Sequence, residues 1–326
     1  MSDDERKEAL ERAGEDIHWL LSFLGPNRES FLSLPELEVL QKLFSQHFTI
    51  HGQAVRLEKE AATGKEKIQS PHDPEARYST KRGKSWTGYK MHTTETANEK
   101  GEINFITDMV TANACERDNE TLPQIQGNLE ECELKPEQQF VDKAYITGDN
   151  LADSQEADIQ LIGEASQLDN KGLLTADEFS MDYESKTATC PAGNTSYSWK
   201  EFETGKHKGD IQISFGKQCQ DCPLKDKCTK NERGRILRLH RHYQLLKERR
   251  EECKTESFKE AMKRRPPVEG TISEMVRSHG LRRSRYRGLA KNHLQNLMIG
   301  TAVNLKRLVK AMSMSKNSQK QQLAAV

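Results

Sequence analysis

Residues 264–310 have the sequence RRPPVEGTISEMVRSHGLRRSRYRGLAKNHLQNLMIGTAVNLKRLVK, in which a helix start is followed by a dense group of arginines. Pro266 and Pro267 cannot lie inside a helix but suit its first turn, so Glu269 is expected near a helix N-terminus. Apolar side chains with helical spacing follow, namely Val268, Ile272, Met275 and Val276. The segment therefore predicts an amphipathic helix that opens with a carboxylate.

A basic cluster comes directly after this helix, formed by Arg282, Arg283, Arg285 and Arg287 around Tyr286. Residues 229–310 contain 22 Lys or Arg against 8 Asp or Glu, although the formal net charge of the whole chain is zero. Such a local surplus favours a polyanionic partner such as a nucleic acid. The alternative is a solvated basic helix end that has no partner.

Length and composition indicate a polar protein of one large domain or two smaller ones. The chain has 326 residues, of which 34% are apolar and 31% charged, and its mean hydropathy is −0.86. No apolar run approaches the roughly 20 residues of a membrane span. The first residues, MSDDERKEALERAGED, contain no hydrophobic signal region. We therefore expect a cytoplasmic, prokaryotic protein with no membrane partner.

Four of the seven cysteines have the spacing of a metal site. Cys219, Cys222 and Cys228 lie in GKQCQDCPLKDKC, and Cys190 precedes them in TATCPAGNTSYSW. Four thiolates from two separate turns suit a tetrahedral structural Zn²⁺. Free thiols and disulfides are the alternatives, although a chain without an export signal meets a reducing compartment. The other three cysteines stand alone, and packing or indifferent surface explains them.

The local patterns predict a mixture of helices and strands. Residues 1–64 have helical periodicity, and the polar, proline-containing residues 65–84 indicate a linker or a loop that faces the substrate. A hairpin is expected from strands at 86–96 and 103–111. A short helix at 122–129 and short strands at 138–142 and 159–162 follow.

Asp142 ends the strand in QQFVDKAY, where α/β sheets commonly present catalytic groups. The alternative is an Asp that only caps the following turn. A second carboxylate from a neighbouring helix, such as Glu269, would complete a hard-oxygen site for Mg²⁺ or Mn²⁺. Two such carboxylates suit phosphodiester chemistry.

Several stretches together resemble DDE-type insertion-sequence transposases over about residues 70–310. They are SPHDPEARYSTKRGKSWTGYKMHTTET, ITDMVTANACERDNETLPQI, FVDKAYITGDNL, the four-cysteine segment and VEGTISEMVRSHGLRRSRYRGLAKNHLQNL. The resemblance implies a ribonuclease H-like catalytic fold, a mixed sheet flanked by helices, and two-metal cleavage and joining of transposon ends. Asp142, with Tyr145 after it, matches the second catalytic acid, and Glu269 matches the third.

The match to the family pattern around Glu269 is partial. Arg265 fits the expected arginine, Met262 replaces a tyrosine, and Arg277 lies one position late for the expected basic residue. DNA contacts are expected from these arginines, from the basic cluster and from the first loop. The full set is Arg265, Arg277, Arg282, Arg283, Arg285, Arg287, Lys81, Arg82 and Lys84.

The first catalytic acid of the family has no counterpart in residues 1–69, so the sequence predicts an N-terminally truncated pattern. Asp73 and Asp108 are the available substitutes. The leading hypothesis is a transposase, whole or truncated, that binds double-stranded DNA at transposon ends and catalyses metal-dependent strand cleavage and transfer, with a homodimer as an open expectation. One alternative is an inactive transposase-derived DNA-binding protein, and another is a metal-dependent nuclease.

The expected organisation follows from these assignments. It comprises a helical lead-in at 1–64, the first part of the catalytic core at 65–165, a cysteine-rich zinc insertion at 166–235, a C-terminal helical part with the DNA-binding arginines at 236–312, and a disordered tail at 313–326.

Overall fold

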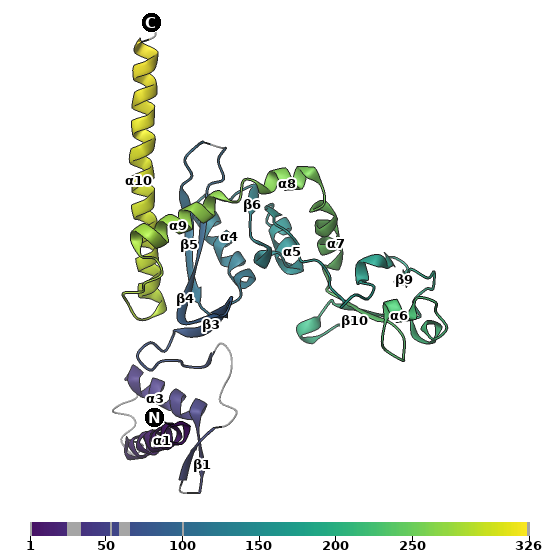
Figure 1. The fold of residues 1–326 in the computed structure, drawn as a ribbon, viewed down its shortest axis with the longest axis horizontal. Coiled ribbons are helices and arrows are strands. Elements are labelled where there is room, and N and C mark those ends of the chain that lie inside the picture. Colours follow the sequence, from purple (N-terminus) through teal and green to yellow (C-terminus); the bar gives the residue numbers. More distant parts are fainter. Residues whose placement is uncertain (1, 25–33, 53, 59–65, 100, 325–326) are drawn as a thin grey trace. The chain divides into compact units, whose positions relative to one another are not determined.

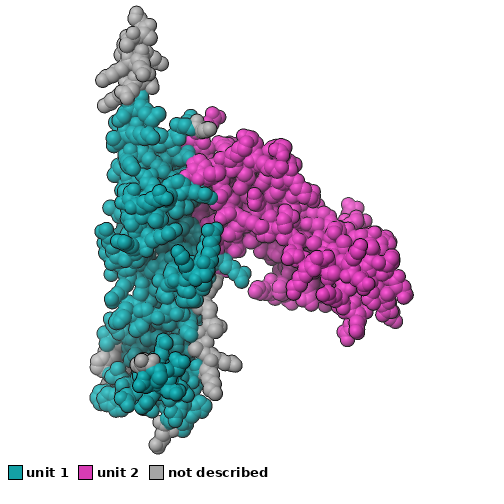
Figure 2. All heavy atoms as spheres, viewed as in Figure 1, with its two compact units in different colours: residues 1–96, 101–117, 268–326 teal, residues 97–100, 118–267 magenta. Residues whose placement is uncertain are grey.

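The computed structural model describes residues 2–24, 34–52, 54–58, 66–99 and 101–324 (Figure 1). The chain divides into two compact units (Figure 2). Unit 1 contains residues 1–96, 101–117 and 268–326, and unit 2 contains residues 97–100 and 118–267. Each unit is therefore built from segments that are distant in sequence.

The N-terminal part of unit 1 combines two helices with a hairpin. Helices α1 (Asp3–Leu24) and α3 (Pro35–His47) precede strands β1 (Phe48–His51) and β2 (Ala54–Leu57), which pair antiparallel. A Cβ on Gly14 of α1 would lie 2.5 Å from the Phe48 ring, so glycine lets the helix approach the hairpin closely. The sequence predicts the helices of this lead-in but not the hairpin.

The central feature of unit 1 is a three-stranded antiparallel sheet. Strands β3 (Arg77–Lys81), β4 (Lys84–Glu95) and β5 (Ile106–Asn113) lie in the order β3-β4-β5. The turn between β3 and β4 consists of Arg82 and Gly83, both with positive φ, which matches a tight hairpin turn. The predicted hairpin is confirmed, with a bulge between Thr94 and Glu95.

Two helices pack on this sheet and complete the core of unit 1. They are α9 (Pro267–His279) and α10 (Leu289–Ala324), and their side chains meet β5 in a cluster of Met109, Met275, Ile299 and Val303. The amide of Asn304 bonds to both backbone groups of Ile106, which fixes α10 along the edge of β5. Helix α10 continues through residues 313–324, a stretch for which the sequence predicts a disordered tail.

The first part of unit 2 is built around a short parallel pair. Strands β6 (Gln138–Phe140) and β7 (Gln160–Ile162) are joined through helix α5 (Gly148–Glu156), and a helical crossover is the usual connection between parallel strands. Helix α4 (Leu122–Glu131) packs with them around Leu122, Leu151 and Leu161. Helices α7 (Tyr243–Glu252) and α8 (Glu256–Met262) end the unit. The predicted helix at 122–129 and both predicted strands are confirmed.

The cysteine-rich part of unit 2 consists of short antiparallel strands. β8 (Ser180–Asp182) pairs with β9 (Thr187–Thr189), and β10 (Ser198–Glu201), β11 (Ile211–Ser214) and β12 (Ile236–Leu239) form a second sheet. The short helix α6 (Lys225–Cys228) lies beside them. Phe179, Phe215, Ile213 and Leu237 form the buried core of this part. Residues 236–239, assigned from sequence to the C-terminal helical part, are a strand of this sheet.

The mixed α/β class is confirmed, with several small sheets in the described residues. The sheet β3-β4-β5 and the pair β6-β7 are separate, and no described strand joins them. The single mixed sheet of a ribonuclease H-like fold therefore stays a prediction. None of the described helices has the length and apolar character required to cross a bilayer.

Candidate functional site

Asp142 lies two positions after the last residue of β6, close to the strand end that the sequence predicts. Its Oδ1 accepts a hydrogen bond from Lys143 N at 2.8 Å and caps the 3₁₀ turn η4 (Lys143–Tyr145). Its Oδ2 lies 3.7 Å from a guanidinium nitrogen of Arg265, and 62% of the side chain is exposed. The carboxylate therefore caps a turn and faces an arginine, while most of its surface remains accessible.

Two consecutive arginines line the same end of β6. Arg264 donates to Ala97 O at 2.7 Å and lies over the Phe140 ring, 5.5 Å from its centroid. Arg265, which pairs with Asp142, is largely covered. A fixed guanidinium pair next to an exposed carboxylate is suited to a phosphate ester, because arginine binds phosphate oxygens in a bidentate manner.

Tyr145 supports the turn after Asp142. Burial raises the pKa of its hydroxyl, and the nearby carboxylates of Asp118 and Asp142 raise it further. The phenol is therefore neutral at physiological pH. Its ring packs against the buried cluster that contains Leu122 and Val141.

Glu269 lies in the first turn of α9, as the proline pair predicts, and it is exposed. A carboxylate in this position also complements the positive end of the helix dipole. Asp142 belongs to unit 2 and Glu269 to unit 1. Their convergence on one Mg²⁺ stays a prediction.

The helix that carries Glu269 is held by a buried ionic network that the sequence patterns do not reveal. Arg307 of α10 donates to Glu95 Oε2 at 3.2 Å and to Thr271 Oγ1 at 2.6 Å. Thr271 in turn donates to Glu95 at 2.5 Å. Glu274 of α9 pairs with Lys306 at 2.6 Å, and this contact lowers the pKa of the Glu274 carboxyl. The network ties α9 to α10 and to the end of β4.

Asp73 and Glu75, which lie in the loop before β3, cap the N-terminus of α10. Asp73 Oδ1 accepts from Tyr89 Oη at 2.7 Å and from Gly288 N at 3.2 Å. Glu75 Oε2 accepts from Leu289 N at 2.8 Å. Asp73, one proposed substitute for the first catalytic acid, is thus occupied by a capping role. The other substitute, Asp108, lies within β5 opposite Thr94.

The basic cluster lies in the loop between α9 and α10, and this loop is folded onto α10. Gln295 accepts from Arg285 N and donates to Arg283 O, both at 2.9 Å. Asn292 donates to Tyr286 O at 3.0 Å. The backbone is therefore fixed while the four arginine side chains are exposed, and so are the predicted DNA contacts on α9 and at the β3–β4 turn, namely Arg277, Lys81, Arg82 and Lys84.

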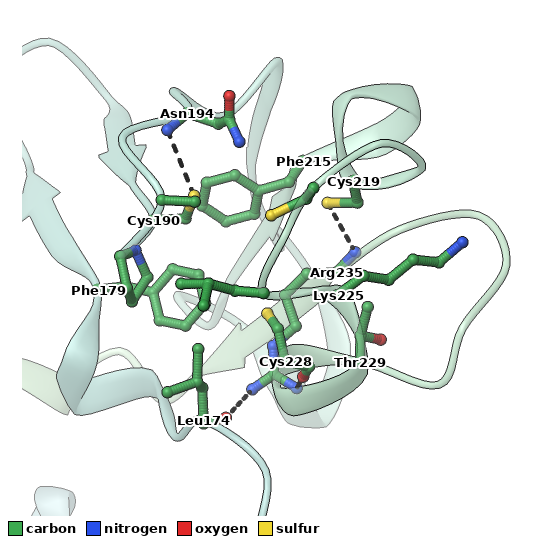
Figure 3. A pocket seen from close by; sticks show the side chains of 14 residues that line it. Leu174, Phe179, Cys190, Asn194, Phe215, Cys219, Lys225, Cys228, Thr229 and Arg235 are labelled. Carbon is green, nitrogen blue, oxygen red and sulfur yellow. Dashed lines mark hydrogen bonds between the residues drawn. The ribbon is translucent and has the colours of Figure 1, made fainter.

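The four cysteines of the insertion line one pocket (Figure 3). Cys190 Sγ accepts a hydrogen bond from Asn194 N at 3.3 Å, and Cys219 Sγ accepts one from Arg235 N at 3.5 Å. Burial raises the pKa of the Cys228 thiol, and the other three sulfurs act in the same direction. All four are free thiols, so the structure has no disulfide among them.

Metal-binding geometry is absent from the part of the chain that the structure describes. No three His, Cys, Asp or Glu side chains there are arranged so that they could hold a metal ion. The four thiols nevertheless share one pocket with backbone N–H groups directed at two of them. Zinc binds cysteine as the thiolate, and a zinc ion in this pocket stays a prediction.

Unit 2 also contains a cluster of charged and histidine side chains that the sequence patterns did not indicate. Asp149, at the start of α5, pairs with Arg241 and lies 3.5 Å from His240 Nε2 and 3.7 Å from His242 Nε2. The spacing of the three basic residues in LHRHY was the available signal. The cluster fixes the segment after β12 to the N-terminus of α5.

Comparison with protein families gives one match, to a family described as "Transposase DDE domain", over residues 189–309. The matched segment includes Cys190, Cys219, Cys222, Cys228 and Glu269, whereas Asp142 lies before it. No curated protein and no solved structure matches the chain. The resemblance to DDE-type transposases is confirmed.

Proposed function

We propose that this transposase-family chain binds DNA through its arginines and acts on DNA strands with the help of a divalent metal. The match to the transposase DDE domain over residues 189–309 carries this proposal. Two structural observations support it. The arginine side chains between α9 and α10 are exposed on a fixed loop, and Arg264 and Arg265 flank an exposed carboxylate at the end of β6.

Asp142 and Glu269 are the residues that would hold Mg²⁺ or Mn²⁺. Both are exposed carboxylates at the end of regular elements, a strand and a helix respectively. A bound metal would supply activation of water or a DNA 3′-hydroxyl and charge stabilisation at the leaving oxygen. Arg265 pairs with Asp142, and a guanidinium group at this position is also suited to a phosphate oxygen.

A structural Zn²⁺ in the cysteine pocket is the second part of the proposal. The shared pocket and the two N–H···S hydrogen bonds support it. The thiols must shift towards one another to reach zinc-ligand distances of about 2.3 Å. Zinc would then hold the strands β8 to β12 together and contribute directly to folding.

One alternative function is favoured by a specific observation. Asp142 already caps η4 and pairs with Arg265, which are roles that a purely structural residue would have. A transposase-derived protein that binds DNA without cleaving it would retain both features. A homodimer is compatible with either function.

A cleavage assay and a binding assay separate these two functions. Supercoiled DNA and DNA that carries candidate transposon ends are incubated with the full chain and Mg²⁺ or Mn²⁺, while gel shifts in EDTA report binding alone. Cleavage that disappears in Asp142→Asn and Glu269→Gln, with gel shifts preserved, supports the enzyme. Binding with no metal-dependent cleavage supports the DNA-binding alternative, and the loss of both contradicts the proposal.

A further inference from the structure

Helix α10 carries an exposed apolar stripe with a seven-residue repeat. The stripe consists of positions spaced alternately by four and three residues, namely Leu294, Met298, Thr301, Leu305, Leu308 and Met312. Every one of these side chains is exposed, with Met298 at 63% and Leu305 at 59%. Alternating steps of four and three are the a and d positions of a coiled coil. Leu297 and Val309, also exposed, widen the stripe.

The opposite face of the same helix is already occupied within unit 1. Asn296, Ile299 and Val303 are buried against β5 and its neighbours. Arg307 and Lys306 are directed towards Glu95 and Glu274. The two faces of α10 thus have different roles, since one holds the helix in its unit and the other is covered by no described residue.

The polar groups along the stripe form hydrogen bonds within their own chain and need no second chain for them. The Thr301 hydroxyl donates to Leu297 O at 2.9 Å, so its methyl group is left to make contacts. Gln295 bonds to the arginine loop, and Asn304 bonds to Ile106. Between Asn292 and Leu305 the helix carries no Asp, Glu, Lys or Arg. This segment of the helix therefore has no charged side chain that would oppose packing against another apolar helix.

The stripe is complementary to itself when two helices run antiparallel. In that arrangement an a position of one helix faces a d position of the other. Leu294 then faces Met312, Met298 faces Leu308, and Thr301 faces Leu305, and each pair is centred on the level of Val303. Such a contact uses the same surface on both subunits and closes with two-fold symmetry.

Charge selects the antiparallel arrangement over the parallel one. The basic residues of α10 lie mostly in its C-terminal part, namely Lys306, Arg307, Lys310, Lys316 and Lys320, and the helix contains no acid. Parallel helices would place these cations next to their own copies. Antiparallel helices place Lys306, Arg307 and Lys310 beside residues 292–305 of the partner, which include no Asp, Glu, Lys or Arg, and also oppose the two helix dipoles.

We propose that α10 is a homodimerisation helix, and that a second copy of this chain binds its stripe as an antiparallel helix pair. The proposal does not depend on the DNA chemistry proposed above. Other occupants of the stripe are a membrane surface or a helix of a different protein. Either would leave the wild type monomeric, and the membrane surface would also make it cosediment with lipid vesicles.

The oligomeric state of the full chain tests the proposal by sedimentation equilibrium. The wild type is expected to be a dimer. Leu305→Glu combined with Leu308→Glu places uncompensated carboxylates in the contact and should raise the dissociation constant at least about 100-fold. Ser313→Glu is the control, because it adds one carboxylate to an exposed position of α10 outside the stripe. It should remain dimeric, and circular dichroism should show unchanged helix content in all variants.

Photo-crosslinking tests the direction of the helices. A benzophenone side chain in place of Met312 should crosslink to the partner peptide that contains Leu294, because antiparallel pairing separates the two copies of position 312 by about 27 Å. A crosslink between the two 312 peptides would overturn the antiparallel arrangement. A monomeric wild type would overturn dimerisation, as would a stripe variant that stays dimeric. A monomer that cosediments with anionic lipid vesicles would assign the stripe to a membrane surface.

Discussion

Arg307 Nη1 lies 3.2 Å from Glu95 Oε2, and only 5% of the Glu95 side chain is exposed. The pair joins the C-terminal helix to the end of β4 across 212 positions of sequence. Thr271 of α9 bonds to both partners. The helix that presents Glu269 is therefore positioned by a buried charge pair, and any reaction that uses Glu269 depends on it.

Glu95→Ala should destabilise unit 1 by about 3 kcal/mol, because it leaves the largely buried guanidinium of Arg307 dependent on the more distant carboxylate of Glu274, at 3.7 Å. Urea unfolding followed by circular dichroism measures the change. Lys306→Ala is the control, since its pair with Glu274 is more exposed and should contribute less than about 1 kcal/mol. Equal losses in the two variants would contradict the role of burial.

Local patterns predicted those elements whose signal lies within a few residues. The hairpin of β4 and β5, the helix at α4 and the start of α9 at the proline pair each have a clear period or a cap. The position of Asp142 at a strand end followed from one short apolar run. These features needed no information about distant contacts.

Long-range contacts and very short strands could not be predicted from local sequence patterns. Strands β8 to β12 have three or four residues each and little alternation, so they depend on packing around Phe179 and Phe215. The cap of Gly288 by Asp73 joins residues 215 positions apart. The Asp149 cluster likewise exists only because α5 and the segment after β12 are brought together.

Acid should weaken the packing of α7 against the cysteine-rich part through Asp177. Its carboxylate accepts two hydrogen bonds from Arg250, at 2.6 and 2.7 Å, and one from Tyr243. Burial alone would raise the pKa of Asp177, but the hydrogen bonds and charge of Arg250 outweigh burial and lower it. Because the folded pKa lies below the unfolded value of about 3.9, the stabilisation is present above that pH and is lost as the pH falls through the folded pKa.

Asp177→Asn is therefore expected to be less stable than the wild type at pH 7 by about 3 kcal/mol, since the almost fully buried Arg250 loses its counter-charge. The difference should shrink as the pH falls below about 4. Urea unfolding at a series of pH values measures both stabilities. A constant difference over that range would show that the charge of Asp177 does not stabilise the fold.

Zinc removal should unfold the cysteine-rich part while unit 1 remains folded. One zinc per chain is expected by metal analysis. The Cys219→Ser variant should bind no zinc. It should also lack the thermal transition of the cysteine-rich part, which a chelator abolishes in the wild type. Cys253→Ser is the matched control, because this half-buried cysteine lies outside the pocket. Purified protein with no zinc, or a Cys219→Ser variant that melts like the wild type, would contradict the zinc proposal.

The exposed arginines should set the salt dependence of DNA binding. Each phosphate contact contributes about 0.9 to the slope of log affinity against log salt concentration. Alanine at Arg282, Arg283, Arg285 and Arg287 together should therefore flatten the slope by up to about 3.6 units. Fluorescence anisotropy with a labelled duplex at several salt concentrations measures it. The loop backbone is fixed by Gln295 and Asn292 rather than by the arginine side chains, so the variant should stay folded. Lys306→Ala, already paired with Glu274, should leave the slope unchanged. An unaltered slope in the quadruple variant would mean that these arginines are only solvated surface.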